Sequence, residues 1–73
     1  MSTEEVFTEL FELLLAHQRA HRRGHHYYCW RSQERYNWLK RQEQEHIYHS
    51  CMHQVRDKLD QEEDVAEQKR RAA

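Results

Sequence analysis

The chain contains no proline and only one glycine, Gly24, among its 73 residues, and this shortage of helix breakers constrains the fold most. Strand-rich domains need frequent turns built around glycine and proline, and no segment here alternates apolar and polar residues over a useful length. We therefore expect an all-helical (all-α) protein. A chain of this length forms at most one domain and buries only a modest core.

Residues 3–23 are predicted to form the first helix. Ser2 and Glu5 fit a capping box, in which the serine accepts hydrogen bonds from first-turn amides and the glutamate reaches back. One helix face then follows the i, i+3, i+4, i+7 spacing of an amphipathic helix. This face comprises Val6, Phe7, Leu10, Leu13, Leu14, His17 and His21. Arginines at the end of the segment, followed directly by glycine, are typical of a helix C-terminus.

The chain is predicted to turn at Gly24 and to form a long second helix over residues 26–60, which gives an antiparallel helical hairpin. One continuous helix through Gly24 is the alternative, because a glycine inside a helix costs only about 1 kcal/mol. The second half of the long helix carries an apolar stripe that we expect to pack on the first helix. The stripe consists of Ile47, Tyr48, Cys51, Met52, Val55 and Leu59. Residues 1–60 would form the hairpin domain, and the charged tail 61–73 would fray.

Aromatic residues in the first half of the long helix do not share one face on a helical wheel. Tyr27 and Trp38 share one side, whereas Cys29 and Tyr36 lie further round. One hairpin covers only one side of such a helix. The sequence therefore predicts a homodimer in which two hairpins form a four-helix assembly. A hairpin that folds only on its target is the alternative.

No secretory signal and no apolar run long enough to cross a bilayer is evident in the sequence. We therefore expect a cytoplasmic protein that does not enter a membrane. Cys29 and Cys51 form no close-spaced motif, and in that compartment we expect both thiols to be reduced.

Charge is distributed unevenly along the chain although the net charge is only −1. Residues 1–16 contain four acidic residues and no basic residue, whereas residues 17–41 contain seven basic residues and one acidic residue. Acidic residues again outnumber basic ones over residues 42–73. This pattern indicates a local basic surface, and it argues against a protein that coats nucleic acid.

The basic segment also holds most of the aromatic residues, and surfaces rich in Trp, Tyr and Arg are typical of protein–protein contacts. We therefore expect this segment to bind another protein. The candidate contact residues are Arg22, Arg23, Tyr27, Tyr28, Trp30, Arg31, Arg35 and Trp38. Single-stranded nucleic acid is the alternative partner, because bases stack on aromatic rings and phosphates pair with arginine. A third interpretation is a solvated basic face beside aromatic residues that only build the core.

Two sets of histidines have the spacing of metal ligands. His17 and His21 are four residues apart, and His46, His49 and His53 share one helix face. Neither set has an evident further ligand, so we expect no metal and no cofactor, with a metal-binding helical bundle as an alternative function.

The sequence contains no nucleophile–base pair in a recognisable motif, no phosphate-binding loop and no paired-carboxylate pocket, so we expect a non-enzyme. No motif connects the chain with a particular family. Very small helical proteins without catalytic motifs include phage-encoded inhibitors of host factors and anti-activators. By this analogy of size and character, we expect a protein that binds and inhibits a target.

Overall fold

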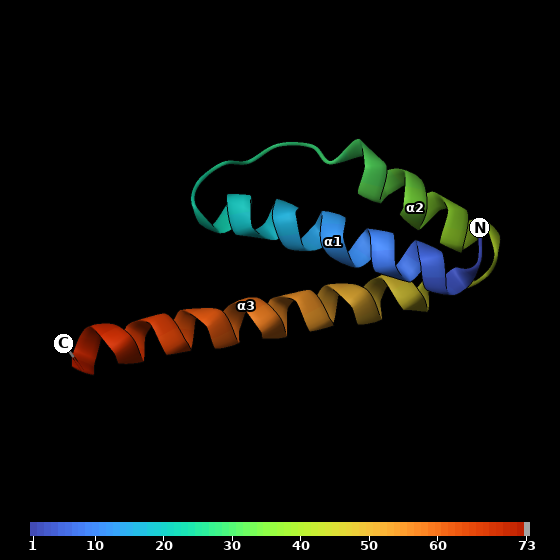
Figure 1. Cartoon of the computed structure of the whole chain (residues 1–73). Helices are drawn as coiled ribbons and strands as arrows, with labels where there is room; N and C mark the ends of the chain where they lie inside the picture. Colours follow the sequence, from blue (N-terminus) through green and yellow to red (C-terminus); the bar gives the residue numbers. More distant parts are fainter. Residues whose placement is uncertain (73) are drawn as a thin grey trace.

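The computed structural model describes residues 1–72, and these residues form three helices. Helix α1 spans Thr3–Arg22, α2 spans Trp30–Arg41 and α3 spans His46–Ala72 (Figure 1). No strand occurs within residues 1–72, which confirms the prediction of an all-helical fold. The molecule measures 49 × 22 × 16 Å and is elongated because α3 continues well past the end of α1.

Helix α1 begins where the sequence predicts. Ser2 is the N-cap, and its Oγ accepts a hydrogen bond from the backbone N–H of Glu5 at 3.2 Å. Glu4 and Glu5 lie in the first turn, where their negative charge is favourable beside the unpaired N–H groups of the helix start. A capping side chain of this kind contributes about 1 kcal/mol to helix stability.

Gly24 closes the other end of α1. Its φ angle is 88°, in the left-handed region that side chains disfavour. The N–H of Gly24 donates to the carbonyl of His21 at 3.0 Å, and the N–H of His25 donates to the carbonyl of Ala20 at 2.8 Å. These two bonds form a Schellman motif, which satisfies the last carbonyl groups of a helix.

The predicted second helix over residues 26–60 is wrong at its start, because α2 begins only at Trp30. Residues 25–29 form a non-helical connection that runs back over α1 (Figure 1). The chain therefore reverses over several residues. Tyr27 is not helical, so it cannot be assigned to a face of a helix together with Trp38. The argument for a second subunit from aromatic residues on several faces of one helix therefore no longer holds.

The same prediction is also wrong in the middle, because the chain turns again between α2 and α3. The N–H of Glu43 donates to the carbonyl of Lys40 at 3.0 Å, and the N–H of Gln44 donates to the carbonyl of Leu39 at 2.8 Å. This is a second Schellman motif. Glu43 occupies its left-handed position, with φ of 56°, where glycine is usual. Because no glycine occurs at this turn, the sequence predicts a continuous helix here.

The three helices pack with α2 antiparallel to α1, whereas α3 runs in the same direction as α1 (Figure 1). Thr3 Oγ1 donates to Gln44 Oε1 at 3.1 Å near the start of the α1–α3 pair. At the other end, Arg22 contacts Glu63. The apolar stripe of residues 47–59 thus packs on α1 as predicted, but in parallel, because α2 carries the chain back to the start of α1.

The core lies where the three helices meet. Among residues 1–72, seven apolar side chains are buried, and each aliphatic one stabilises the fold by about 1.5–3 kcal/mol. They are Val6, Leu10 and Leu14 of α1, Leu39 of α2, and Cys51, Val55 and Leu59 of α3. The predicted stripes on α1 and α3 therefore supply six of these seven side chains.

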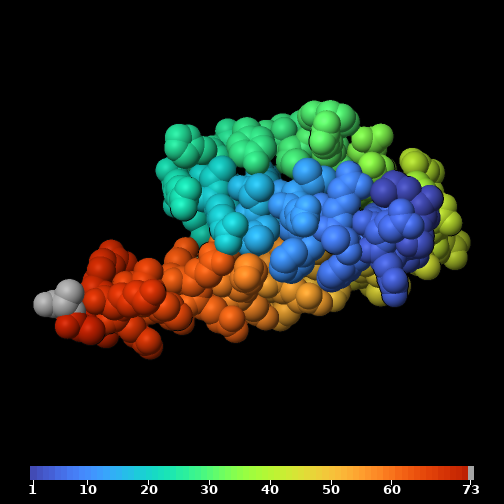
Figure 2. All heavy atoms as spheres, viewed as in Figure 1, coloured from blue at the N-terminus to red at the C-terminus, as the bar shows by residue number. Residues whose placement is uncertain are grey.

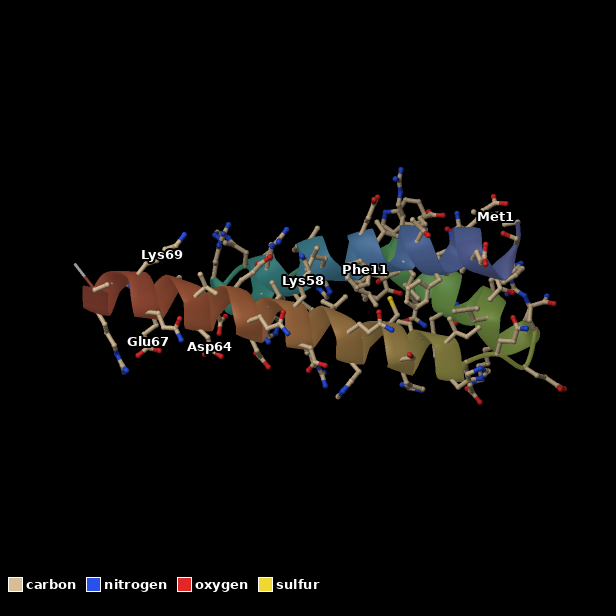
Figure 3. All side chains as sticks on the ribbon, turned by 60° about the horizontal axis from the view of Figure 1, so that its bottom comes forward. Met1, Phe11, Lys58, Asp64, Glu67 and Lys69 are labelled. Carbon is tan, nitrogen blue, oxygen red and sulfur yellow. The ribbon has the colours of Figure 1, made fainter. Side chains whose placement is uncertain are left out.

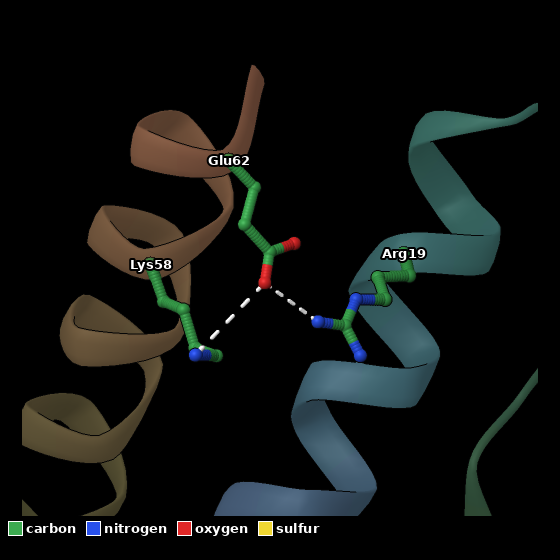
Figure 4. A network of polar contacts seen from close by, with 3 residues as sticks. All are labelled: Arg19, Lys58 and Glu62. Carbon is green, nitrogen blue, oxygen red and sulfur yellow. Dashed lines mark hydrogen bonds and ion pairs between the residues drawn. The ribbon is translucent and has the colours of Figure 1, made fainter. Parts of the chain in front are cut away.

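The C-terminal segment continues α3 as an exposed helix through residues 61–72. Glu62 Oε1 lies 2.7 Å from Arg19 Nη2 and 3.9 Å from Lys58 Nζ, and joins α3 to α1 (Figure 4). The division of the chain into a domain and a fraying tail stays a prediction, and Ala73 of that tail lies outside the described residues. Within residues 1–72, no helix has the length and apolar character needed to cross a membrane.

Candidate functional site

Arg22 is a predicted contact residue that serves the fold instead. Its Nη1 lies 2.9 Å from Asp60 Oδ1 and 2.9 Å from Glu63 Oε1. Hydrogen bonding to Glu63, and then to Asp60, raises the pKa of the Arg22 guanidinium. The side chain is therefore already paired with α3 and is a poor candidate for binding a partner.

Two further predicted contact residues also serve the fold. Arg35 Nε donates to Glu9 Oε2 at 2.9 Å, and this hydrogen bond raises the pKa of the Arg35 guanidinium. Trp38 is half-buried and packs against the core. Together with Arg22, these residues join the helices, which leaves five of the eight predicted contact residues outside these interhelical contacts.

The remaining five residues gather around the connection between α1 and α2. Tyr28 is 73% exposed and Trp30 is 60% exposed, which is unusual for large aromatic side chains. The Arg31 guanidinium carbon lies 5.3 Å from the centre of the Trp30 ring, within the range of a cation–π contact. We name the following exposed set the connection surface: Arg23, His25, His26, Tyr27, Tyr28, Trp30 and Arg31.

Two histidines of α1 hold the connection in place. His17 Nε2–H donates to the carbonyl oxygen of Tyr27 at 2.7 Å, and the two rings meet edge to face at 4.8 Å. One turn later, the ring of His21 meets the ring of His26 edge to face at 4.2 Å. The sequence pattern placed both histidines on the apolar face of α1 but did not reveal this anchoring role, because a long connection was not expected.

The connection surface carries two arginines and no acidic residue. No acidic residue occurs between residues 13 and 33 of the chain. None of the ion pairs within residues 1–72 involves Arg23 or Arg31. Both arginines are therefore free to pair with acidic groups of a partner.

The histidines of α3 do not build a metal centre. His46, His49 and His53 are all exposed on α3, and His53 Nε2 lies 3.5 Å from Asp57 Oδ2. Across residues 1–72, no group of three or more His, Cys, Asp or Glu side chains is arranged to hold a metal ion. The geometry thus gives no support to the metal-binding alternative.

The two cysteines are free thiols in different environments. Cys51 is fully buried, and desolvation raises the pKa of its thiol to about 11. Because the thiolate is the reactive form, Cys51 is a poor nucleophile at neutral pH. Cys29 is half-buried at the start of α2.

Comparisons with protein-family models, with curated proteins and with solved structures yield no match to this chain. Its function is therefore inferred from its own side chains. The connection surface offers aromatic faces, hydroxyl and imidazole groups for hydrogen bonding, and arginines for charge pairing. These groups suit binding of a partner.

Proposed function

We propose that the chain is a non-catalytic, cytoplasmic protein-binding module that inhibits a target protein through its connection surface. The observation that carries this proposal is the exposed Trp30 ring with the Arg31 guanidinium in cation–π contact over it. Trp, Tyr and Arg are the residues that contribute most to protein–protein affinity, because they combine a large apolar area with directed polar contacts.

Charge favours a protein over nucleic acid as the partner. The chain is slightly acidic overall, and Glu4, Glu5, Glu9 and Glu12 line one side of α1. Phosphate groups that approached the connection surface from this side would be repelled. A short protein segment that carries both acidic and apolar side chains could bind the connection surface without reaching the acidic side of α1.

Inhibition follows from occupation of the target's surface, since the chain has no evident group for covalent chemistry. The connection region presents Tyr28 and Trp30 already exposed, so no part of the fold has to open before a target can contact them. We also expect the protein to act as a homodimer, which would present two connection surfaces to the target.

Affinity capture from cell extract, followed by mass spectrometry, tests the proposal. The tagged wild-type chain is compared with the Arg23→Ala/Arg31→Ala variant and with an Arg70→Ala/Arg71→Ala control, which removes the same charge from the far end of α3. We expect a protein that the wild type and the control retain and that the Arg23→Ala/Arg31→Ala variant loses. The purified target should then lose activity when the wild-type chain is added.

An electrophoretic shift assay with single-stranded oligonucleotides distinguishes the proposed protein target from the alternative partner, single-stranded nucleic acid. Binding through phosphates weakens steeply as the salt concentration rises. Tight binding at low salt that disappears at moderate salt, and that needs Arg23 and Arg31, would replace the protein target with nucleic acid. Weak binding even at low salt is the result that our proposal predicts.

A further inference from the structure

A groove between α1 and α3 is left open on the side that α2 does not cover. Its walls come only from these two helices, with Phe7 of α1 and Ile47 of α3 as the large apolar residues. A second hollow continues it along Phe11 to Gln54. The Phe7 and Phe11 rings lie 6.3 Å apart and are nearly parallel, and both side chains are only half-buried. The groove is thus an apolar surface with no partner inside the chain.

The end of α3 is a helix with no neighbour. It extends past the contact between Arg22 and Glu63, and it protrudes from the rest of the molecule in the space-filling view (Figure 2). Val65 on this segment is 50% exposed and forms a shallow hollow with Ala66 and Lys69. We call residues 64–72 the overhang. A free helix end of this kind is marginally stable by itself.

We propose that two copies of the chain form a closed dimer in which the overhang of each copy lies in the Phe7–Ile47 groove of the other. The two α3 helices would cross antiparallel about a twofold axis at the level of residue 56. This proposal rests on the homodimer of the proposed function and specifies its interface, which lies on a different face from the connection surface. Within one chain the overhang has no neighbour and the groove has no occupant. A twofold dimer gives both overhangs a neighbour and fills both grooves.

The residues along α3 fit this arrangement. One flank of the helix carries residues at spacings of three and four, which lie on one side of a helix. These are Ile47, Ser50, Gln54, Lys58, Gln61 and Val65, all of which line the grooves on this side. Two pairs among them are symmetric about residue 56, so that Ile47 of one copy meets Val65 of the other, and Gln54 meets Lys58. Both ends of the contact are then apolar.

Charge at the rim of the groove also matches a second copy. Glu4 lies on the groove rim at the level where the antiparallel arrangement brings the overhang of the other copy. The overhang carries Lys69 (Figure 3), which lines the same hollow as Val65. A parallel dimer would instead place the two overhangs together and leave both grooves empty. No residue of the connection surface lines the groove, so the dimer leaves both connection surfaces free.

Sedimentation of the full chain tests the proposal through Val65→Asp. The wild type should sediment at twice the monomer mass. Since Val65 is 50% exposed and does not belong to the core, the variant should keep its helix content, while its dimer dissociation constant rises at least about tenfold from burying a charge. Arg71→Ala, which lowers the net charge equally from another side of the overhang, should leave the dimer intact. A monomeric wild type, growth beyond the dimer, or a Val65→Asp dimer of unchanged affinity would each overturn the proposal.

A charge exchange identifies the two contacting surfaces. Glu4→Lys and Lys69→Glu should each weaken the dimer by about fivefold, because each removes both symmetry-related ion pairs of the dimer, and both pairs are exposed. The double variant should recover the wild-type affinity, because the pair is restored with reversed signs. Recovery is specific to contact between these two positions, so losses that simply add in the double variant would contradict the arrangement. Neither result depends on the target, and failure of target capture leaves this test unaffected.

Discussion

Arg35 of α2 donates a hydrogen bond to Glu9 of α1 at 2.9 Å, and this part-buried ion pair is the polar link between the two helices. We predict a coupling free energy of about 0.5–1 kcal/mol for the pair, because both side chains are only partly shielded from water. The measurement is a double-mutant cycle in urea with Glu9→Gln and Arg35→Gln. The exposed Glu67–Arg71 pair is the control and should show a smaller coupling, so equal couplings would contradict the structural role of Arg35.

Glu43→Gly should stabilise the protein by up to about 1 kcal/mol, since glycine adopts a positive φ without strain and Glu43 has φ of 56°. Gln42, at φ of −88°, is the matched control beside it. Gln42→Gly adds backbone freedom to the unfolded chain without relieving strain, and it should therefore lower the unfolding temperature. A lower unfolding temperature for both variants would contradict a positive φ angle at Glu43.

Gly24→Ala should destabilise the protein by about 1–2 kcal/mol, the cost of a left-handed conformation for a residue with a side chain. The cost arises from the backbone alone, because a Cβ atom at Gly24 would meet no other atom within 4 Å. Gly24→Asn should lose clearly less stability, since asparagine tolerates this conformation. Thermal unfolding of the three proteins checks this order, and equal losses for Ala and Asn would show that strain is not the cause.

The buried Cys51 thiol makes stability depend on pH in the alkaline range. Its pKa is raised from 9.0 to about 11 in the folded chain, so the unfolded chain loses the proton first. The free energy of unfolding should therefore fall as pH rises from 9 to 11, and the fall should be smaller in Cys51→Ala. Alkylation at neutral pH should modify Cys51 only on unfolding. Rapid modification of both thiols in the folded protein would contradict its burial.

The sequence predicted α1 almost to the residue because three independent signals agree there: the Ser2 cap, the regular apolar spacing and Gly24. It failed over residues 26–60 for two physical reasons. The second Schellman motif places glutamate where glycine is usual, so composition carries no mark of the turn. The connection over residues 25–29 is held by contacts of His17 and His21 with distant residues, which local spacing does not encode.

The sequence predicted where the candidate site lies but not which residues form it. Residue type identified the basic and aromatic segment, and the connection surface lies within it. The sequence could not show that Arg22 and Arg35 are paired within the fold, because an arginine that pairs with Glu63 or Glu9 looks the same in sequence as one that is free. Only the packing of the three helices shows that these two arginines are paired and that Arg31 is not.

The fluorescence of Trp30 in complex with the captured target tests the central claim most directly. Trp38→Phe leaves Trp30 as the only tryptophan, and its ring is 60% exposed in the free chain. Binding, followed separately by sedimentation, should shift the Trp30 emission to shorter wavelength and protect the ring from acrylamide quenching. A target that binds while the emission and quenching of Trp30 stay unchanged would contradict the connection surface as the binding site.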